Sequence, residues 1–439
     1  MSPTNQTHDP KRLSWVETAN TRDTAFPVQN LPLGIFRRSA GGEVARAGTA
    51  IGDQILDLAA ARRAGLIDGR AADTCAEPTL NRMMALGPAD WSRLRAQIFD
   101  CLASDGERAD DCRRRAGELL VPMADATMEL PAAIGDYTDF FTSIYHATNA
   151  GRMFRPDNPL QPNFKYMPVA YHSRASSVVV SGTPVGRPHG QARGPDDPAP
   201  TFGPSRRLDY ECELGFFIGT GNKLGEPVPV ARAGERIFGF CLLNDWSARD
   251  IQGWESQPLG PFLGKSFSTS ISPWIVTAEA LAPFRCPAFP RAAGDPAPLP
   301  HLAAASEAER GGLDIVMEVW LQTGRMRREN TAPTRLTRSN ARDCYWTVGQ
   351  MVAHHTSNGC NLRPGDLCAT GTVSSEAPDS LGCMLELTWG GTKPVTLPNG
   401  ETRRFLDDGD ELILRAHCAR DGAVSIGLGE CRGVIQPAR

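Results

Sequence analysis

The chain has 439 residues, with 46 Lys and Arg against 50 Asp and Glu, and a formal net charge of −4. This balance excludes the basic surface that nucleic-acid binding needs, and no segment approaches the ~18 consecutive apolar residues of a membrane-spanning helix. The N-terminus lacks the apolar core of a signal peptide, and the 12 cysteines include no C-x-x-C pair. We expect a cytoplasmic protein with reduced thiols, long enough for two domains.

The first domain is expected over residues 1–130. The segments FPVQNLPLGIF and GTAIGDQILDL predict short strands. Behind them, Trp91, Leu94, Ile98 and Leu102 recur at helical spacing, with Asp90 as the expected N-cap. Such an apolar stripe is far more typical of a core-facing helix than of a cofactor site.

The second domain, over residues 131–439, is predicted to be rich in strands. Short apolar runs broken by Gly and Pro include ASSVVVSG, LDYECELGFFIG, DIVMEVWLQTG and GDELILRAHC. Two stretches rich in Pro, Gly and Ala, HGQARGPDDPAPTFGPS and residues 290–312, predict surface loops.

The segment DYTDFFTSIYHATNAG holds a candidate base. If this segment is helical, Asp139 and His146 are about two turns apart, with roughly 10 Å of rise, and lie on nearly the same face. One helix could then direct a metal ligand and an imidazole towards one cavity. A lone His is more often structural than catalytic, but a neutral imidazole suits proton transfer near pH 7, so both roles stay open for His146.

Two glutamates stand two residues apart in LDYECELGFFIG. On a strand, Glu211 and Glu213 share one face, and their mutual repulsion requires a cation or solvent. A solvated surface strand is the plain alternative. Asp245 strengthens the metal hypothesis, because it follows the buried-strand pattern IFGFCLL and precedes a helix start for which Ser247 is the expected N-cap. All-oxygen ligands suit Mg²⁺ or Ca²⁺.

Other motifs are rejected. Gly219, Gly221 and Gly225 have the wrong spacing for a dinucleotide loop, and EPVPV follows where a helix should begin. His354 and His355 diverge by about 100° on a helix, which favours packing roles over a shared metal. The chain has no G-x-S-x-G, so a serine-nucleophile hydrolase is unsupported.

Four long strings carry a family resemblance: DYTDFFTSIYHATNAGRMFRP, YHSRASSVVVSGTPVGRP, LNDWSARDIQGWESQPLGPFLGKSFSTSISPW and GCMLELTWGGTKPV. With them, the chain resembles the fumarylacetoacetase family, the full-length two-domain type of fumarylacetoacetate hydrolase. The resemblance implies a β-rich mixed α/β fold, with a small SH3-like barrel in residues 1–130 and a β-sandwich or roll catalytic domain in residues 131–439. It also implies a homodimer with active sites close to the subunit interface.

The resemblance also implies residue roles. The metal ligands would be Asp139, Glu211, Glu213 and Asp245, with Lys265 and Thr269 beside the ion. His146 would be the general base and Glu386 the carboxylate that orients it. The groups around the reacting oxygens would be Arg249, Gln252 and Lys265. The substrate would be contacted by Phe141, Arg155, Tyr171, Gln252, Ser256 and Thr372.

The implied activity is metal-dependent hydrolysis of a carbon–carbon bond in 4-fumarylacetoacetate, giving fumarate and acetoacetate, the last step of tyrosine and phenylalanine catabolism. Water adds to one ketone, a carbanion leaves as an enolate, and Mg²⁺ or Ca²⁺ acts as Lewis acid. The alternatives are a related acylpyruvate hydrolase or keto-acid decarboxylase, and a catalytically silent binding protein.

Three positions depart from the family pattern. Phe141 and Ser256 stand where the family usually has Tyr, and Ser268 stands where it commonly has Gly. Losing a phenolic hydroxyl at Phe141 removes one hydrogen bond, about 0.5–1.5 kcal/mol. Ser256 removes a whole aromatic wall. These departures bear on substrate preference rather than on reaction type.

Overall fold

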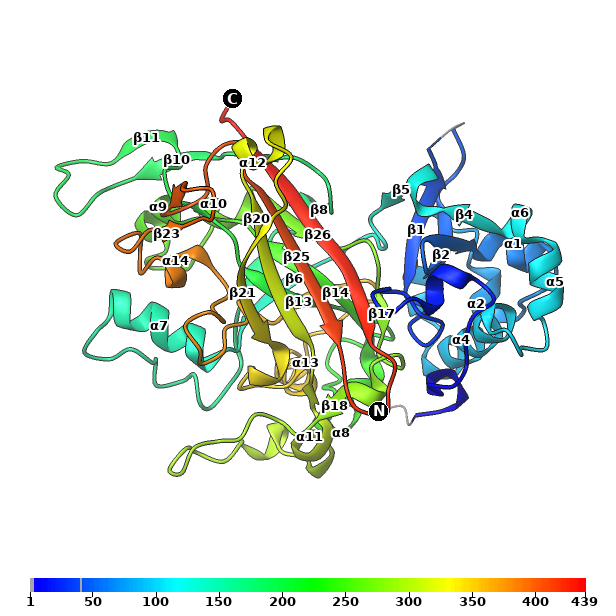
Figure 1. Cartoon of the computed structure of the whole chain (residues 1–439). Helices are drawn as coiled ribbons and strands as arrows, with labels where there is room; N and C mark the ends of the chain where they lie inside the picture. Colours follow the sequence, from blue (N-terminus) through cyan, green and yellow to red (C-terminus); the bar gives the residue numbers. More distant parts are fainter. Residues whose placement is uncertain (1–3, 40–41) are drawn as a thin grey trace.

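The computed structural model describes residues 4–39 and 42–439. A small unit built from the N-terminal part of the chain packs beside a larger unit that holds the rest (Figure 1). Strands dominate the larger unit, and short helices surround them. The predicted β-rich mixed α/β fold is therefore confirmed. Within the described residues, every helix is too short or too polar to cross a bilayer.

The small unit contains a five-stranded antiparallel sheet of order β4-β3-β2-β1-β5. Its strands are β1 Leu33–Arg38, β2 Arg46–Ile51, β3 Gln54–Asp57, β4 Leu120–Pro122 and β5 Ala126–Glu129. Its helices are α1 Leu58–Arg63, α2 Arg70–Asp73, α3 Asn81–Met84, α4 Pro88–Leu102, α5 Ala109–Arg114 and α6 Ala116–Leu119. Strands were predicted correctly in LPLGIF and GTAIGDQILDL, but FPVQN is a turn. The SH3-like barrel remains a prediction.

Helix α4 carries the predicted apolar stripe but begins earlier than expected. Its N-cap is Gly87, and Asp90 lies inside the first turn. The prediction of Asp90 as N-cap is wrong because Pro88 takes the first helical position, where its fixed φ and missing N–H are tolerated. Leu94 and Ile98 are buried, as expected of a core-facing stripe.

The larger unit contains two main sheets, besides short two-stranded pairs. The first has the path β7-β6-β22-β13-β14-β16-β8, with β17 also paired to β14. Its strands are β6 Tyr137–Phe141, β7 Val169–Ser173, β8 Val178–Val180, β13 Cys212–Ile218, β14 Ile237–Asp245, β16 Thr269–Ile271, β17 Val276–Thr277 and β22 Leu367–Ala369. The second has the order β21-β20-β25-β26-β9. Its strands are β9 Val185–Gly186, β20 Val316–Gln322, β21 Thr334–Asn340, β25 Glu411–Cys418 and β26 Ile426–Gln436.

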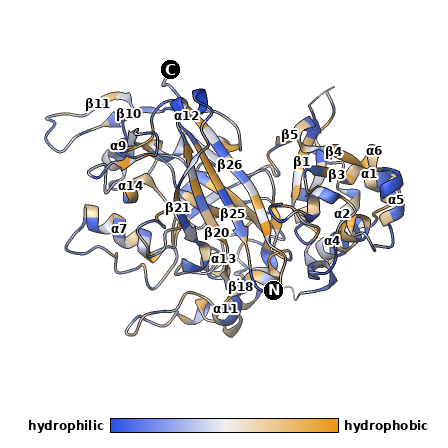
Figure 2. Cartoon of the chain, in the orientation of Figure 1, coloured by the Kyte–Doolittle hydropathy of each residue, from blue (hydrophilic) through white to orange (hydrophobic). Residues whose placement is uncertain are grey.

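The first sheet is covered on both faces. Phe216 and Leu242, with even numbers, pack in one core with side chains of the second sheet such as Leu414. Phe217 and Leu243, with odd numbers, pack in a separate core with side chains of the small unit. Alternate residues of a strand point to opposite faces, so the second sheet and the small unit sandwich the first sheet. Along β20, buried residues alternate with half-buried ones, and hydrophobic with hydrophilic residues (Figure 2).

Helices of the larger unit gather at the ends of the strands. Three of them, α7 Ile144–Phe154, α9 Arg249–Glu255 and α14 Met384–Leu387, lie on the side away from the small unit (Figure 1). The others are α8 Val230–Ala233, α10 Leu263–Ser266, α11 Ala305–Arg310, α12 Gly324–Arg328 and α13 Val348–Thr356. The remaining strands are β10 His189–Ala192, β11 Thr201–Pro204, β12 Leu208–Asp209, β15 Ser247–Ala248, β18 Arg285–Cys286, β19 Gly312–Leu313, β23 Val395–Thr396 and β24 Thr402–Arg403.

Two predicted loops contain regular structure. The stretch HGQARGPDDPAPTFGPS forms a hairpin in which β10 pairs with β11. Residues 290–312 include α11, whose sequence ASEAER favours a helix despite the prolines upstream. The loop predictions were therefore too coarse. None of the 12 cysteines forms a disulfide, and reduced thiols stay a prediction.

Candidate active site

The segment with Asp139 and His146 is divided between a strand and a helix. Asp139 lies in β6, where it faces Ala369 of β22 and Tyr171 of β7. Helix α7 begins only at Ile144, and the Ser143 side chain caps it by accepting from the His146 amide. The prediction of one helix through both residues is wrong because the aromatic run around Asp139 pairs inside the sheet.

Four buried carboxylates meet at one end of the first sheet. Ligand atoms of the four side chains lie within 4.8 Å of one another; the residues are Asp139, Glu211, Glu213 and Asp245. Asp139 lies in β6 and Asp245 at the end of β14, while Glu213 lies at the start of β13 and Glu211 directly before it. All have odd numbers, in register with Phe217 and Leu243, so they occupy the sheet face that the small unit covers farther along. The structure therefore brings these four acids together, and their role as metal ligands stays a prediction.

Some carboxylate oxygens of this cluster have no hydrogen-bond donor among the described residues. Both carboxylate oxygens of Glu213 and Oδ1 of Asp139 are buried without a hydrogen-bond donor among the described residues. Burial, and then the neighbouring carboxylate charges, raise the pKa of Glu213 and of Asp139 well above the ordinary range. An orphaned buried carboxylate is costly, and a divalent cation removes that cost. The cluster therefore fits a hard, oxygen-binding metal ion.

Two cations hold Glu211. Lys265 Nζ lies 2.6 Å from Glu211 Oε2 and 2.6 Å from Asp245 Oδ2, and Arg249 Nη1 lies 2.7 Å from Glu211 Oε1. Burial would raise the pKa of Glu211, but these two charges outweigh it and hold the pKa below its ordinary value. Lys265 alone cannot neutralise four carboxylates. Arg249 contributes only part of its charge to this cluster, because it also pairs with Asp209. A divalent ion would bring the cluster close to neutrality.

Hydroxyl groups orient Asp245. Tyr171 donates to Oδ2 at 2.8 Å, and Thr269, opposite Asp245 on β16, donates to Oδ1 at 3.1 Å. Ser247 does not cap α9 as predicted. The N-cap is Ala248, and the Ser247 hydroxyl instead donates to the Asp245 carbonyl at 3.0 Å. The short strand β15, Ser247–Ala248, displaces the helix start by one residue.

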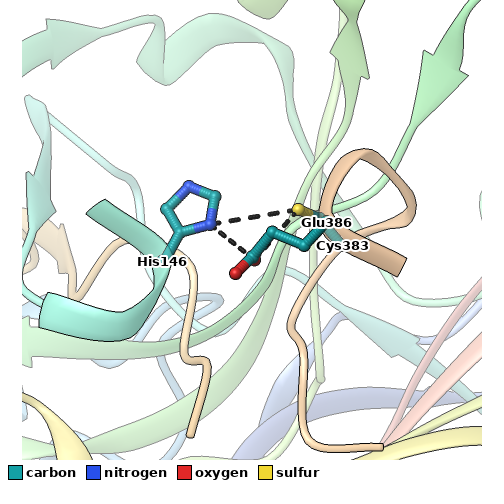
Figure 3. Close-up of side chains that lie close together, drawn as sticks. All are labelled: His146, Cys383 and Glu386. Carbon is teal, nitrogen blue, oxygen red and sulfur yellow. Dashed lines mark hydrogen bonds and ion pairs between the residues drawn. The ribbon is translucent and has the colours of Figure 1, made fainter. Parts of the chain in front are cut away.

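His146 and Glu386 form a buried pair (Figure 3). His146 Nδ1 lies 2.6 Å from Glu386 Oε2. A carboxylate only accepts, so Nδ1 carries the proton and Nε2 keeps its lone pair. Ser374 donates to Oε2 at 2.7 Å and Asn149 donates to Oε1 at 2.9 Å. Burial opposes ionisation, but the His146 contacts and these donors hold the pKa of Glu386 below its ordinary value.

Comparison with known proteins agrees with this geometry. Residues 138–436 match the sequence profile of the fumarylacetoacetate (FAA) hydrolase C-terminal family, and residues 29–131 match that of the fumarylacetoacetase N-terminal family. The chain is 49% identical to fumarylacetoacetase of Oryza sativa, over 97% of both chains, and 49% identical to that of Homo sapiens, over 95% of this chain and 97% of the other. The chain belongs to the fumarylacetoacetase family.

A solved structure supports the same fold. Fumarylacetoacetate hydrolase from the psychrophilic Exiguobacterium antarcticum aligns over 93% of this chain and 100% of its own, with a TM-score of 0.50 and 16% identity. At this identity, the likeness concerns the fold alone.

The residues expected to contact substrate are only partly brought together. Phe141 and Arg155 line a cavity of about 380 Å³ beside α7, within the usual size range of small-ligand sites. Gln252 accepts from Arg249 Nη1 at 3.2 Å, while Ser256 is the C-cap of α9. Arg249 Nη2 and Thr372 Oγ1 are buried without a partner among the described residues. These two groups are free to meet a ligand.

Two residues around this site, Asp209 and Asn149, were not predicted from the sequence. Asp209 accepts from Arg249 Nε at 2.8 Å, and from the backbone amides of Met384 and Leu385 at 2.7 and 2.9 Å. It therefore joins the arginine that holds Glu211 to the helical turn that carries Glu386. Its proximity to Glu211 in LDYECE was the only available signal. Asn149, one turn after His146, had the helical i,i+3 spacing.

Proposed function

We propose that this chain is a fumarylacetoacetase, which hydrolyses 4-fumarylacetoacetate to fumarate and acetoacetate. One observation carries the proposal: the structure contains both a buried histidine, His146, whose Nδ1 lies 2.6 Å from Glu386, and a cluster of four buried carboxylates. The His146–Glu386 pair would supply the base that takes a proton from water. The carboxylate cluster fits a metal ion that would bind a diketone. The names of relatives 49% identical over nearly the whole chain support this substrate.

The metal would be held by Asp139, Glu211, Glu213 and Asp245. The orphaned oxygens of Glu213 and Asp139 support this assignment, since they gain partners only from a ligand. A divalent ion there supplies Lewis acidity to the diketone oxygens and lowers the charge of the cluster. The all-oxygen donor set favours Mg²⁺ or Ca²⁺. Lys265 and Thr269 would hold the ligand carboxylates in position.

His146 would take the proton from the attacking water. Its Nε2 lone pair is available because Nδ1 donates to Glu386. The imidazolium that forms is stabilised by the Glu386 charge, as in a catalytic triad with water as nucleophile. As the carbon–carbon bond breaks, its electron pair becomes the enolate of the acetoacetate portion, and His146 returns the proton. No covalent enzyme intermediate is needed.

Arg249, Gln252 and Lys265 would surround the oxygen that gains negative charge. Arg249 Nη2 is buried and unpaired among the described residues, so an N–H group is available without breaking another contact. A donor of this kind contributes about 3 kcal/mol to transition-state stabilisation. Thr372, whose hydroxyl is similarly unpaired, would contact the substrate together with Tyr171.

The pocket walls would be made by Phe141, Arg155 and Ser256. Phe141 packs edge-on against the His146 ring, with 5.2 Å between ring centroids, so its ring would limit the space beside the base. Arg155 is exposed at the end of α7 and would bind a terminal carboxylate of the substrate. Ser256, on α9, would leave more room than the usual Tyr.

We also propose the finer features that the family resemblance implies. The enzyme would act in the cytoplasm as a homodimer, with an N-terminal domain over residues 1–130 and a catalytic domain over residues 131–439. Two separate family matches, over residues 29–131 and 138–436, support a division near this boundary.

The test is the loss of fumarylacetoacetate ultraviolet absorbance on adding metal-depleted protein, before and after restoring Mg²⁺ or Ca²⁺. Cleavage that requires a divalent ion, with fumarate and acetoacetate as products, is the expected result. His146→Ala should abolish turnover without changing metal content, and Glu376→Gln, at an exposed position, serves as control. Turnover of acylpyruvate but not of fumarylacetoacetate would replace the substrate assignment.

A further inference from the structure

A thiol that the proposed mechanism does not use points at the His146–Glu386 pair. Cys383 Sγ lies 3.3 Å from Glu386 Oε2 and 4.0 Å from His146 Nδ1 (Figure 3). Cys383 is the N-cap residue of α14, and Glu386 follows three residues later on the same turn. His146 approaches from α7. All three side chains are buried, and each offers one ligand atom within 4.8 Å of the others.

We propose that His146, Cys383 and Glu386 form an inhibitory zinc site, separate from the carboxylate cluster. Nitrogen, thiolate sulfur and carboxylate oxygen are the atoms that bind Zn²⁺, and three protein ligands with one open position are typical of reactive zinc sites. The four-carboxylate cluster instead offers only oxygen, which Mg²⁺ and Ca²⁺ prefer. The two neighbouring sites therefore select different classes of ion.

The present distances are close to those of a tetrahedral site. With Zn–N and Zn–O bonds of about 2.0 Å and a Zn–S bond of about 2.3 Å, ligand atoms lie roughly 3.3–3.6 Å apart. Cys383 Sγ is 3.3 Å from the carboxylate oxygen and 4.0 Å from the imidazole nitrogen. The hydrogen-bonded pair, at 2.6 Å, must open by about 0.7 Å, and the sulfur–nitrogen pair, at 4.0 Å, must close by roughly 0.5 Å. Small rotations of two side chains achieve this.

Binding would silence the base by changing its tautomer. For Nδ1 to bind Zn²⁺, its proton must move to Nε2, and Nε2 then lacks the lone pair that accepts a proton from water. Cys383 binds as thiolate, so its S–H proton leaves to solvent while Glu386 remains a carboxylate. One proton is released per ion, and no oxidant is involved. The His146 ring packs against Phe141, which lines the 380 Å³ cavity.

The first experiment measures binding without turnover. Cd²⁺ is added as a probe to the full-length protein in saturating Mg²⁺, and the ultraviolet thiolate-to-metal absorption is recorded for wild type, Cys383→Ser and Cys360→Ser. Cys360 is a more accessible thiol without a histidine or carboxylate contact. We expect one ion per chain to be lost only in Cys383→Ser. Equal absorption in wild type and Cys383→Ser would overturn the site.

The second experiment measures inhibition, and this part rests on the proposed role of His146 as base. Zn²⁺ is titrated at saturating Mg²⁺, and each variant is normalised to its own zinc-free rate. Losing the thiolate should weaken zinc inhibition by about 100-fold, whereas Cys360→Ser should follow wild type. Unchanged inhibition in Cys383→Ser would overturn the inhibitory role. If that variant fails to fold, as judged by circular dichroism, Cys383→Ala replaces it in both experiments.

Discussion

Replacing Glu386 by Gln tests the support of the base most directly. In the native protein, Oε2 receives donors from His146, Ser374 and Cys383, while Oε1 receives only Asn149. A glutamine places one oxygen and one NH₂ group in these positions. Three donors favour the oxygen on the His146 side, and the Asn149 amide can rotate to accept from the NH₂. The substitution therefore removes charge while the hydrogen bond to His146 stays.

The size of the effect follows from that charge. An imidazolium and a carboxylate with charge centres about 4 Å apart attract by about 4 kcal/mol at an effective dielectric constant of 20. This attraction exists only once His146 has accepted a proton, so its loss acts on the transition state. Since ~1.4 kcal/mol is tenfold in rate, kcat should fall about 10³-fold in Glu386→Gln. KM should stay close to the wild-type value, because Glu386 is not among the residues that line the cavity beside Phe141 and Arg155.

The assay is steady-state hydrolysis of fumarylacetoacetate at saturating divalent ion, with Glu376→Gln as matched control. A kcat within threefold of wild type would refute the assignment of Glu386 as the group that supports His146. A normal kcat with a much higher KM would place Glu386 in substrate binding instead.

Four further predictions concern the surroundings of the base. Glu213→Gln should lower metal affinity at least tenfold by elemental analysis and isothermal titration; wild-type metal content would remove Glu213 from the ligand set. The raised pKa of Glu213 means that, in metal-free protein, the folded state binds a proton that the unfolded state has lost, so the melting temperature should fall as pH rises above about 4.5, the ordinary value. Saturating Mg²⁺ or Ca²⁺, or the substitution Glu213→Gln, should flatten this dependence of melting temperature on pH. An unchanged slope would contradict the argument that buried carboxylates repel one another in this cluster. Asp209→Asn should reduce both metal affinity and kcat, because Asp209 touches Arg249 and the turn of Glu386, whereas loss of thermal stability alone would make it merely structural. Ser256→Tyr should lower KM for fumarylacetoacetate severalfold, and a higher KM would show that the wider pocket suits the natural substrate.

The sequence predicted what depends on local pattern and composition. Alternation and apolar runs located β13 and β14, and the spacing of Glu211 and Glu213 was sufficient to place them on one face. The sequence did not reveal that β6 ends before His146, because DYTDFFTSIYH is compatible with a helix as well as with a strand. Only the neighbouring strands β7 and β22 decide between the two. Asp209 and Cys383 were out of reach for the same reason. Their partners lie about 175 and 237 residues away along the chain, and only the tertiary fold brings them together.

The first sheet uses a single face for two opposite purposes. Near its middle, Phe217 and Leu243 are sealed by the small unit, and at its end the same face holds Glu213 and Asp245. The N-terminal unit thus keeps water away from the strands beside these carboxylates. It thereby preserves the low polarity in which unpaired carboxylates are stable only with a cation. A shortened chain without that unit would expose this face of the first sheet to solvent. Its metal affinity would then depend on whatever else came to cover the same strands.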